Sequence, residues 1–259
     1  MPFQQMNSLR IYQFELFRRP GLIHGIVSRH GGVSPAPWKS LNIGGNVGDD
    51  AQRVETNTLR IFDAFGIDPA SKYDVWQSHS ADYAIAEEPR GNALPKFADI
   101  ILTSKPKIAI MMRFADCVPI LLYDPAARVI GTVHAGCKGM ILRAPQRAVQ
   151  VMEETFGSNP EDLIVGIGPA ICADCYPVGE EVRQSVVDTF AGNADKYMRY
   201  NKEIPHLDLW TMAEDQLVEV GVREIENAEI CTAMNLEDWF SHRAEGGRTG
   251  RFASLIALE

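Results

Sequence analysis

The sequence predicts one α/β domain built around a mixed β-sheet. Three short apolar runs, at residues 108–112, 118–123 and 129–133, are rich in β-branched residues and bounded by turn signals, which is typical of buried strands. Segments with helical spacing of apolar residues alternate with runs of this kind along the chain. No linker, composition break or internal repeat divides the 259 residues, so we expect a single domain over residues 1–259.

The first third of the chain predicts a strand, a long loop and a helix. Residues 22–28 read as a strand, and the segment from there to Asp50 is rich in Gly, Ser, Asn and Pro, which is typical of a loop. Loops of this length are often functional. Asp49 or Asp50 can cap the helix that follows, and Gly66 ends it.

The later elements follow the same alternation. A short extended piece at 74–77 precedes a Pro- and Gly-rich loop at 87–97 and the three central strands. After Gly139 we expect a helix with Pro145 in its first turn, where a missing N–H costs nothing. The remaining elements are a strand at 163–167, helices at 180–190 and 209–220, and late strands at 223–231 and 252–258.

The charge of the chain limits its partners. Apolar residues make up 46% and charged residues 23%, as in ordinary globular proteins, and the formal net charge is −9. No basic face is evident, so we expect no nucleic-acid partner and no binding to an anionic membrane. A small anionic substrate held by a few arginines remains compatible with this charge.

The five cysteines have an odd count, low density and no spacing typical of a disulfide framework, which favours a reducing compartment. The first twenty residues lack the features of a signal peptide, and no apolar run approaches the ~20 residues that span a bilayer. We therefore expect a cytoplasmic protein.

Cys117 and His134 each lie beside a turn at the end of a predicted strand. Alone, either residue would more often be a core residue. Catalytic zinc, however, commonly takes three protein ligands from His, Cys and carboxylates, and His79 supplies a third suitable side chain. Asp116 is expected either to orient one of the imidazoles or to cap its own turn.

Two further groups of residues have open roles. Cys172 and Cys175 form a C-x-x-C without a second pair of ligands at a plausible spacing, so we assign these loop cysteines no role. Arg243, Arg248 and Arg251 either bind phosphate or carboxylate through their guanidinium groups or form a solvated basic loop. The pattern alone favours the solvated loop.

A series of short motifs runs nearly from end to end of the chain. They are Arg29-His-Gly-Gly-Val-Ser, Ser40-Leu-Asn42, Gln77-Ser-His79, Ala115-Asp-Cys117-Val-Pro, His134-Ala-Gly, Gly168-Pro-Ala-Ile, Cys231-Thr and Phe240-Ser-His-Arg243 with Thr249-Gly-Arg251. In this order they resemble the YfiH-like proteins, also called the laccase-domain or multicopper polyphenol oxidase family. Bacterial members of that family are described as purine nucleoside phosphorylases.

The resemblance implies a four-layer α/β/β/α fold with mixed sheets and a catalytic zinc site at His79, Cys117 and His134. It also implies phosphorolysis of adenosine, inosine and methylthioadenosine, together with adenosine deamination, so the partners would be a nucleoside and phosphate. We expect Arg29, Asn42 and Lys138 to bind substrate. Family members are also credited with copper-dependent oxidation of polyphenols, and one with amide hydrolysis in peptidoglycan precursor editing.

The chain departs from the family pattern beside the expected site. Cys137 and Lys138 stand where the motif has Trp and Arg, and Pro177 replaces a carboxylate residue. Three alternatives to the nucleoside enzyme therefore stay open. They are an amide hydrolase with Cys117 as nucleophile and His134 as base, a binding protein with structural zinc, and a copper-dependent polyphenol oxidase.

Overall fold

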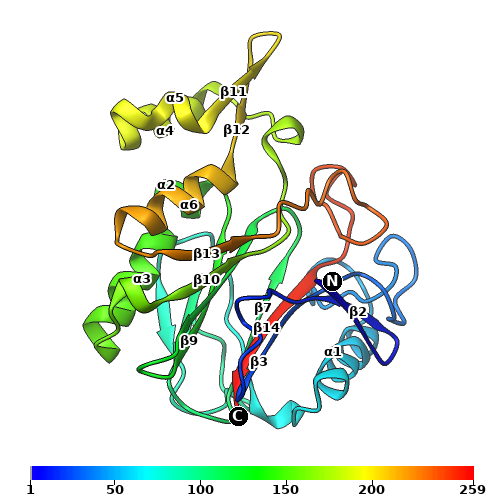
Figure 1. Ribbon diagram of the computed structural model, residues 1–259. Coiled ribbons are helices and arrows are strands. Elements are labelled where there is room, and N and C mark those ends of the chain that lie inside the picture. The colour runs from blue at the N-terminus through cyan, green and yellow to red at the C-terminus, as the bar shows by residue number, and fades with distance from the viewer. Residues whose placement is uncertain (1) are drawn as a thin grey trace.

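The computed structural model describes residues 2–259, and most of the strands in this range form two six-stranded mixed sheets (Figure 1). The first sheet has the order β1-β2-β3-β14-β7-β4, in which only the β7–β4 pair of the described strands is parallel. Its strands are β1 (Phe3–Met6), β2 (Leu9–Tyr12), β3 (Leu22–Val27), β14 (Phe252–Leu258), β7 (Ala109–Phe114) and β4 (Lys72–Tyr73).

The second sheet has the order β13-β10-β8-β9-β6-β5, with parallel pairs at its two edges and antiparallel pairs between. Its strands are β13 (Glu224–Asn227), β10 (Ile164–Ile167), β8 (Val118–Asp124), β9 (Val129–Ala135), β6 (Ile100–Thr103) and β5 (Tyr83–Ile85). A separate hairpin of β11 (Met198–Asn201) and β12 (Ile204–Leu207) points away from both sheets in Figure 1.

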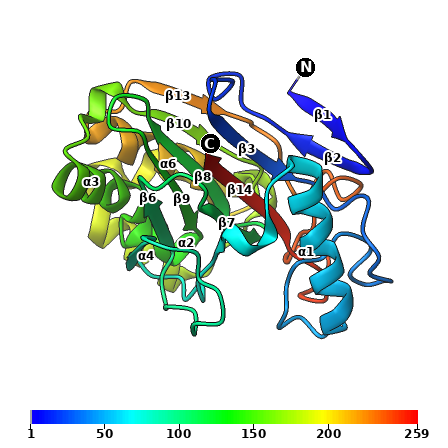
Figure 2. The same cartoon turned by 90° about the horizontal axis from the view of Figure 1, so that it is seen from below.

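Helices cover the outer face of each sheet. Figure 2 shows α1 (Ala51–Phe65) on one side of the sheets and α3 (Ala144–Phe156), α4 (Glu180–Phe190) and α6 (Leu209–Glu219) on the other. The helices α2 (Cys137–Ile141) and α5 (Ala194–Tyr197) are short. Four turns are 3-10 helices, which are η1 (Pro69–Ser71), η2 (Pro160–Asp162), η3 (Ala173–Cys175) and η4 (Ala191–Asn193).

Three apolar cores separate these layers. Because neighbouring residues of a strand point to opposite faces, Met111 packs with Phe62 of α1 while Ile110 packs with Leu121 of the second sheet. Ile120, beside Leu121, packs instead with Met152 of α3. The layers therefore run helix, sheet, sheet, helices, which confirms the expected α/β/β/α fold with mixed sheets.

Most predicted elements are present with shifted ends. Asp50 caps α1 by accepting the N–H groups of Gln52 and Arg53, and Gly66 ends this helix at φ 67°, as the sequence predicts. The extended piece predicted at 74–77 is present only as an isolated parallel bridge between Trp76 and Phe97, because the strand β4 ends at Tyr73. Over residues 2–259, no helix has the length and apolar character needed to cross a bilayer.

Candidate active site

His79, Cys117 and His134 converge at one edge of the two sheets. His134 lies near the end of β9, Cys117 in the turn between β7 and β8, and His79 in the loop between β4 and β5. Their ligand atoms all lie within 4.8 Å of one another. The fold therefore brings together three residues that are far apart in the sequence.

Asp99 holds two of these three ligands in position. Its Oδ1 lies 2.7 Å from Nδ1 of His134, which leaves Nε2 of this ring as the atom free to bind a metal. Its Oδ2 accepts the backbone N–H groups of Ser78, at 3.1 Å, and Ser80, at 2.7 Å, on either side of His79. His79 has φ 58°, a left-handed conformation uncommon outside glycine, which these two bonds support.

Charge is separated within this group. Burial would raise the pKa of the Cys117 thiol, but His134 and His79 lower it below its ordinary value. Burial would likewise lower the pKa of His134, but Cys117 and Asp99 raise it. Cys117 therefore favours the thiolate form, which is the form that binds metals and attacks carbon.

The residues present fit a metal ion. Two imidazoles and one thiolate are suitable ligands for zinc or copper, and a catalytic zinc site keeps a further position open. Gly136 borders the group, and a Cβ there would lie 2.7 Å from Sγ of Cys117 and 3.5 Å from Nδ1 of His79. Any larger residue at 136 would therefore occupy the space beside these two ligand atoms.

A cavity of about 620 Å³ opens over the three ligands, a size typical of small-molecule sites. The side chains that distinguish it are cationic. They are Arg113, Lys138, Arg243 and Arg251. Among the residues of 2–259 that line the cavity, Asp116 is the one carboxylate. An acidic chain thus presents a cationic cavity, which suits an anionic substrate.

Lys138 lines the cavity as expected, but Arg29 does not. The Arg29 guanidinium donates to the carbonyls of Lys39, Leu236 and Trp239 and forms an ion pair with Glu245. This guanidinium therefore joins protein segments, and its expected role in binding phosphate stays a prediction.

Asn42 is also outside the cavity lining. It is fully buried, and its Oδ1 accepts the N–H groups of Gly44 and Arg251, each at 2.8 Å. Asn42 thus holds the backbone of a cavity residue, Arg251, and its expected contact with substrate stays a prediction. The long loop around it still reaches the site, because Gly45 and Asn46 line the cavity.

Asp116 neither orients an imidazole nor caps its own turn. Its Oδ1 accepts the hydroxyl of Thr232 at 2.7 Å, and its Oδ2 accepts the N–H of Arg243 at 2.6 Å. The carboxylate next to Cys117 therefore fixes the loop that carries Arg243. Asp99 has the orienting role instead, and its position before the strand at residue 100 gave no motif that would single it out.

Of the three tail arginines, Arg243 and Arg248 are exposed, as expected of a solvated loop, whereas Arg251 is half-buried. Arg243 and Arg251 line the cavity, and Arg248 does not. The Arg243 guanidinium donates to the carbonyl of Pro177 at 2.7 Å and lies over the ring of Tyr176. Spacing alone could not reveal this contact, because 66 residues separate Arg243 from Pro177.

Known proteins share this fold and length. A purine nucleoside phosphorylase of Streptomyces coelicolor is 35% identical over 239 residues, covering 92% of this chain and 96% of its own length. Purine nucleoside phosphorylase YfiH of Escherichia coli is 34% identical, covering 89% and 91%. The crystal structure of YlmD from Geobacillus stearothermophilus superposes with a TM-score of 0.93 at 30% identity, covering 100% of this chain and 99% of that one.

The model of one protein family, described as multi-copper polyphenol oxidoreductase laccase, matches residues 23–259. This match contains all three converging ligands and the four cationic residues of the cavity. The chain belongs to this laccase-like family, whose relatives include the YfiH and YlmD proteins.

Proposed function

We propose that the protein is a zinc-dependent purine nucleoside phosphorylase. One observation carries the proposal: the His79–Cys117–His134 group and four cationic side chains line the same cavity. Phosphorolysis needs an anion held beside a nucleoside, and the cationic lining supplies that attraction. The names of the relatives support the same reaction class.

Each part of the cavity has a role in this proposal. Zinc would be held by Nε2 of His134, the Cys117 thiolate and His79, and when bound it supplies a Lewis acid and an acidified water. Arg243 and Lys138 would bind the phosphate that attacks C1′ of the ribose, while the bond from C1′ to the purine breaks and the base leaves with a proton. Trp76, which is 48% exposed and lines the cavity, offers an aromatic face for the base in place of the tryptophan missing at Cys137.

The test is incubation of zinc-loaded protein with adenosine, with and without phosphate, followed by chromatography of the products. Phosphate-dependent adenine and ribose 1-phosphate, absent with Cys117→Ala, are the expected result. Inosine formed without phosphate would identify deamination, which the resemblance also implies. Inosine and methylthioadenosine are the next substrates to compare. No conversion of any nucleoside would contradict the proposal.

A second candidate is a cysteine hydrolase that acts on amides, including peptidoglycan precursors. The observation that favours it is the Cys117–His134–Asp99 arrangement, in which His134 lowers the pKa of the thiol and Asp99 orients His134. A thiolate, an imidazole and an orienting carboxylate are sufficient for nucleophilic catalysis. Cys117 would attack the amide carbon, and His134 would give a proton to the leaving amine.

Alkylation separates the two candidates. Iodoacetamide should modify Cys117 slowly in zinc-loaded protein and quickly after chelation, because a zinc-bound thiolate is a weaker nucleophile. Cys137 is the internal control, since burial and the neighbouring Cys117 raise the pKa of its thiol to about 11. Amidase activity that persists without metal and is lost on alkylation of Cys117 would favour the hydrolase.

Three wider expectations remain proposals. Copper-dependent oxidation of polyphenols has the least support of the candidate reactions. That chemistry uses several coppers, and the described residues of the cavity provide one group of three metal ligands. The five cysteines within residues 2–259 are free thiols, which supports a reducing location such as the cytoplasm. A single domain is supported by the apolar core that joins the two sheets.

A further inference from the structure

A second group of sulfur atoms lies outside the catalytic cavity. Cys172 precedes the turn η3 and Cys175 is its last residue, and Cys231 lies 56 residues further along the chain from Cys175. The three Sγ atoms lie within 4.8 Å of one another. The sequence gave the C-x-x-C pair no partner, and the fold supplies Cys231 as its third member.

Backbone hydrogen bonds hold these cysteines in register. Ala170 pairs with Cys231 in a parallel bridge, in which Ala170 N–H donates to Ile230 and Thr232 N–H donates to Ala170, each at 3.1 Å. The N–H of Cys172 lies 3.3 Å from Sγ of Cys231. The cluster is therefore part of the folded framework.

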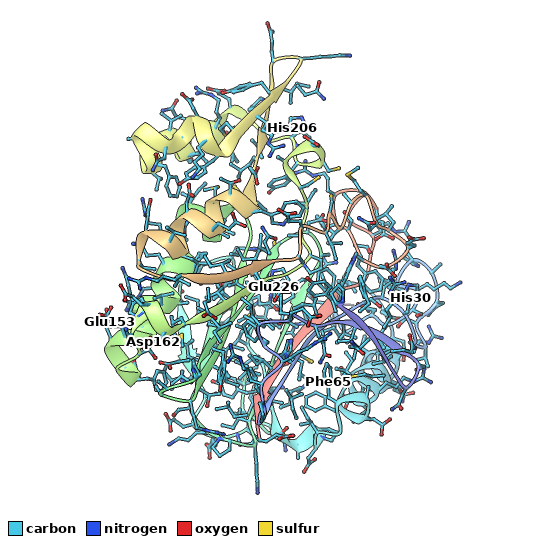
Figure 3. The ribbon with its side chains drawn as sticks, viewed as in Figure 1. His30, Phe65, Glu153, Asp162, His206 and Glu226 are labelled. Carbon is cyan, nitrogen blue, oxygen red and sulfur yellow. The ribbon has the colours of Figure 1, made fainter. Side chains whose placement is uncertain are left out.

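His206 fixes the turn from the other side. It lies on β12 close to this part of the chain (Figure 3), and its Nδ1 donates to the carbonyl of Ala173 at 2.8 Å. The carboxylate within the turn, Asp174, pairs instead with Arg199 at 3.9 Å. His206 and Asp174 are therefore occupied by other partners, and the metal-ligand atoms of this cluster are all sulfur.

A fourth sulfur lies next to the cluster. Sδ of Met234 is 3.9 Å from Sγ of Cys172, although the Met234 side chain is 68% exposed. The hydrophobic effect does little to hold an exposed methionine in place, so burial does not account for the position of Met234 beside this thiol. Thiolate and thioether together are the donors that soft cations prefer, whereas magnesium, calcium and manganese prefer oxygen.

We propose that Cys172, Cys175 and Cys231 form a second metal site that takes Cu(I), with Met234 as an additional thioether donor. Thioethers select Cu(I), while zinc sites use Cys, His and carboxylates. Each thiol that binds the ion releases its proton to solvent, and neither the metal nor the sulfur changes oxidation state. The site differs from the His79–Cys117–His134 group and is independent of the proposed nucleoside chemistry.

The site has a structural consequence for the cavity. Ile171 and Tyr176, which bracket the C-x-x-C segment, both line it. A cation bound by this segment and by Cys231 would link the part of the cavity lining formed by Ile171 and Tyr176 to the loop that follows β13. Metal in the sulfur cluster would therefore restrict the motion of two cavity residues without touching the substrate.

The test uses the full chain with His79→Ala and Cys117→Ala, which leaves His134 as the one remaining ligand of the catalytic group and so removes the competing site. Reduced protein is titrated anaerobically with Cu(I) against the chelator bicinchoninate. Retention of Cu(I) is expected, with an affinity that falls at least about tenfold when Cys172→Ser is added. Cys137→Ser in the same background is the matched control and should change nothing. X-ray absorption should show sulfur neighbours only.

The Met234→Leu variant gives a second measurement, the Cu(I) affinity compared with the Zn²⁺ affinity. A purely structural role of Met234 would not change one affinity without the other. The variant should weaken Cu(I) binding and leave any Zn²⁺ binding unchanged, because zinc gains nothing from the thioether. Cys172 is only partly buried, so its serine variant should fold, and thermal melting checks this. Equal Cu(I) affinity with and without Cys172, or no retention of Cu(I) by the reduced protein, would overturn the proposal.

Discussion

Asp99 Oδ1 lies 2.7 Å from Nδ1 of His134, and the two residues are also joined by a backbone bond from His134 N–H to the carbonyl of Asp99. Burial alone would raise the pKa of Asp99, but the hydrogen bonds from His134 and Ser80 hold it well below its usual range. Asp99 is thus an ionised, fully buried carboxylate that orients the His134 imidazole and holds the backbone on either side of His79.

Replacing Asp99 with Asn should lower metal affinity by roughly 10- to 100-fold, because an amide cannot accept from His134 and from the Ser78–Ser80 loop at the same time. Zinc competition with a chromophoric chelator measures this loss. Asp82→Asn is the control, since Asp82 is an exposed aspartate just after the Ser78–Ser80 loop. Equal affinity in both variants would show that Asp99 does not position the ligands.

Gly136→Ala should disable the ligand group while leaving the fold intact. The added methyl would lie 2.7 Å from Sγ of Cys117, closer than carbon and sulfur can approach, so the thiolate must move. Metal content after dialysis should drop, and any turnover with it. Gly192→Ala has open space around its Cβ and serves as the matched glycine control. Full metal occupancy in Gly136→Ala would contradict this role.

Arg243→Ala should raise the KM for phosphate about tenfold or more, because a charge-assisted hydrogen bond is worth roughly 1.5–3 kcal/mol. Arg248→Ala, on the same loop but outside the cavity, should leave the KM for phosphate unchanged. Initial rates at varied phosphate and saturating nucleoside separate the two variants. A purely structural effect of Arg243 would instead lower thermal stability with the KM intact.

His24 should make the protein sensitive to mild acid. Burial lowers the pKa of this histidine from 6.5 to about 4, and its Nε2 has no hydrogen-bond partner among the described residues. Between these values the unfolded chain binds a proton that the folded chain does not, so stability falls as pH drops from 6.5 to 4. The full loss would be roughly 3 kcal/mol.

Urea unfolding of His24→Leu across this pH range tests the assignment. The variant should lose most of the pH dependence, because leucine can pack against Phe14 and Phe17 without a titrating group. His242→Leu removes an exposed histidine and should keep the dependence of the parent. An equally steep acid loss in His24→Leu would place its source elsewhere.

Local patterns predicted the local structure well. The helix at 180–190 and the strand at 252–258 have the expected bounds, because each depends on the spacing of its own apolar residues. The edge strands β1 and β5 were not predicted, since short, partly exposed strands carry little apolar pattern.

The ligand residues were identifiable from the sequence, but their supporting contacts were not. His79, Cys117 and His134 carry distinctive chemistry and fall within motifs of a known family. Asp99, Asn42 and Arg29 each act through at least one distant partner, 35, 209 and 216 residues away, which no single stretch can reveal. The proximity of Cys231 to Cys172 also depends on pairing between distant segments.

Strand β14 lies in the middle of the first sheet, between β3 and β7, although it comes from residues 252–258. During synthesis on the ribosome, β3 and β7 emerge long before the strand that joins them. Their facing edges stay unpaired until then, so the first sheet closes late and through contacts of high sequence separation. We therefore expect folding to be slow, and the nascent chain to depend on protection of those two edges.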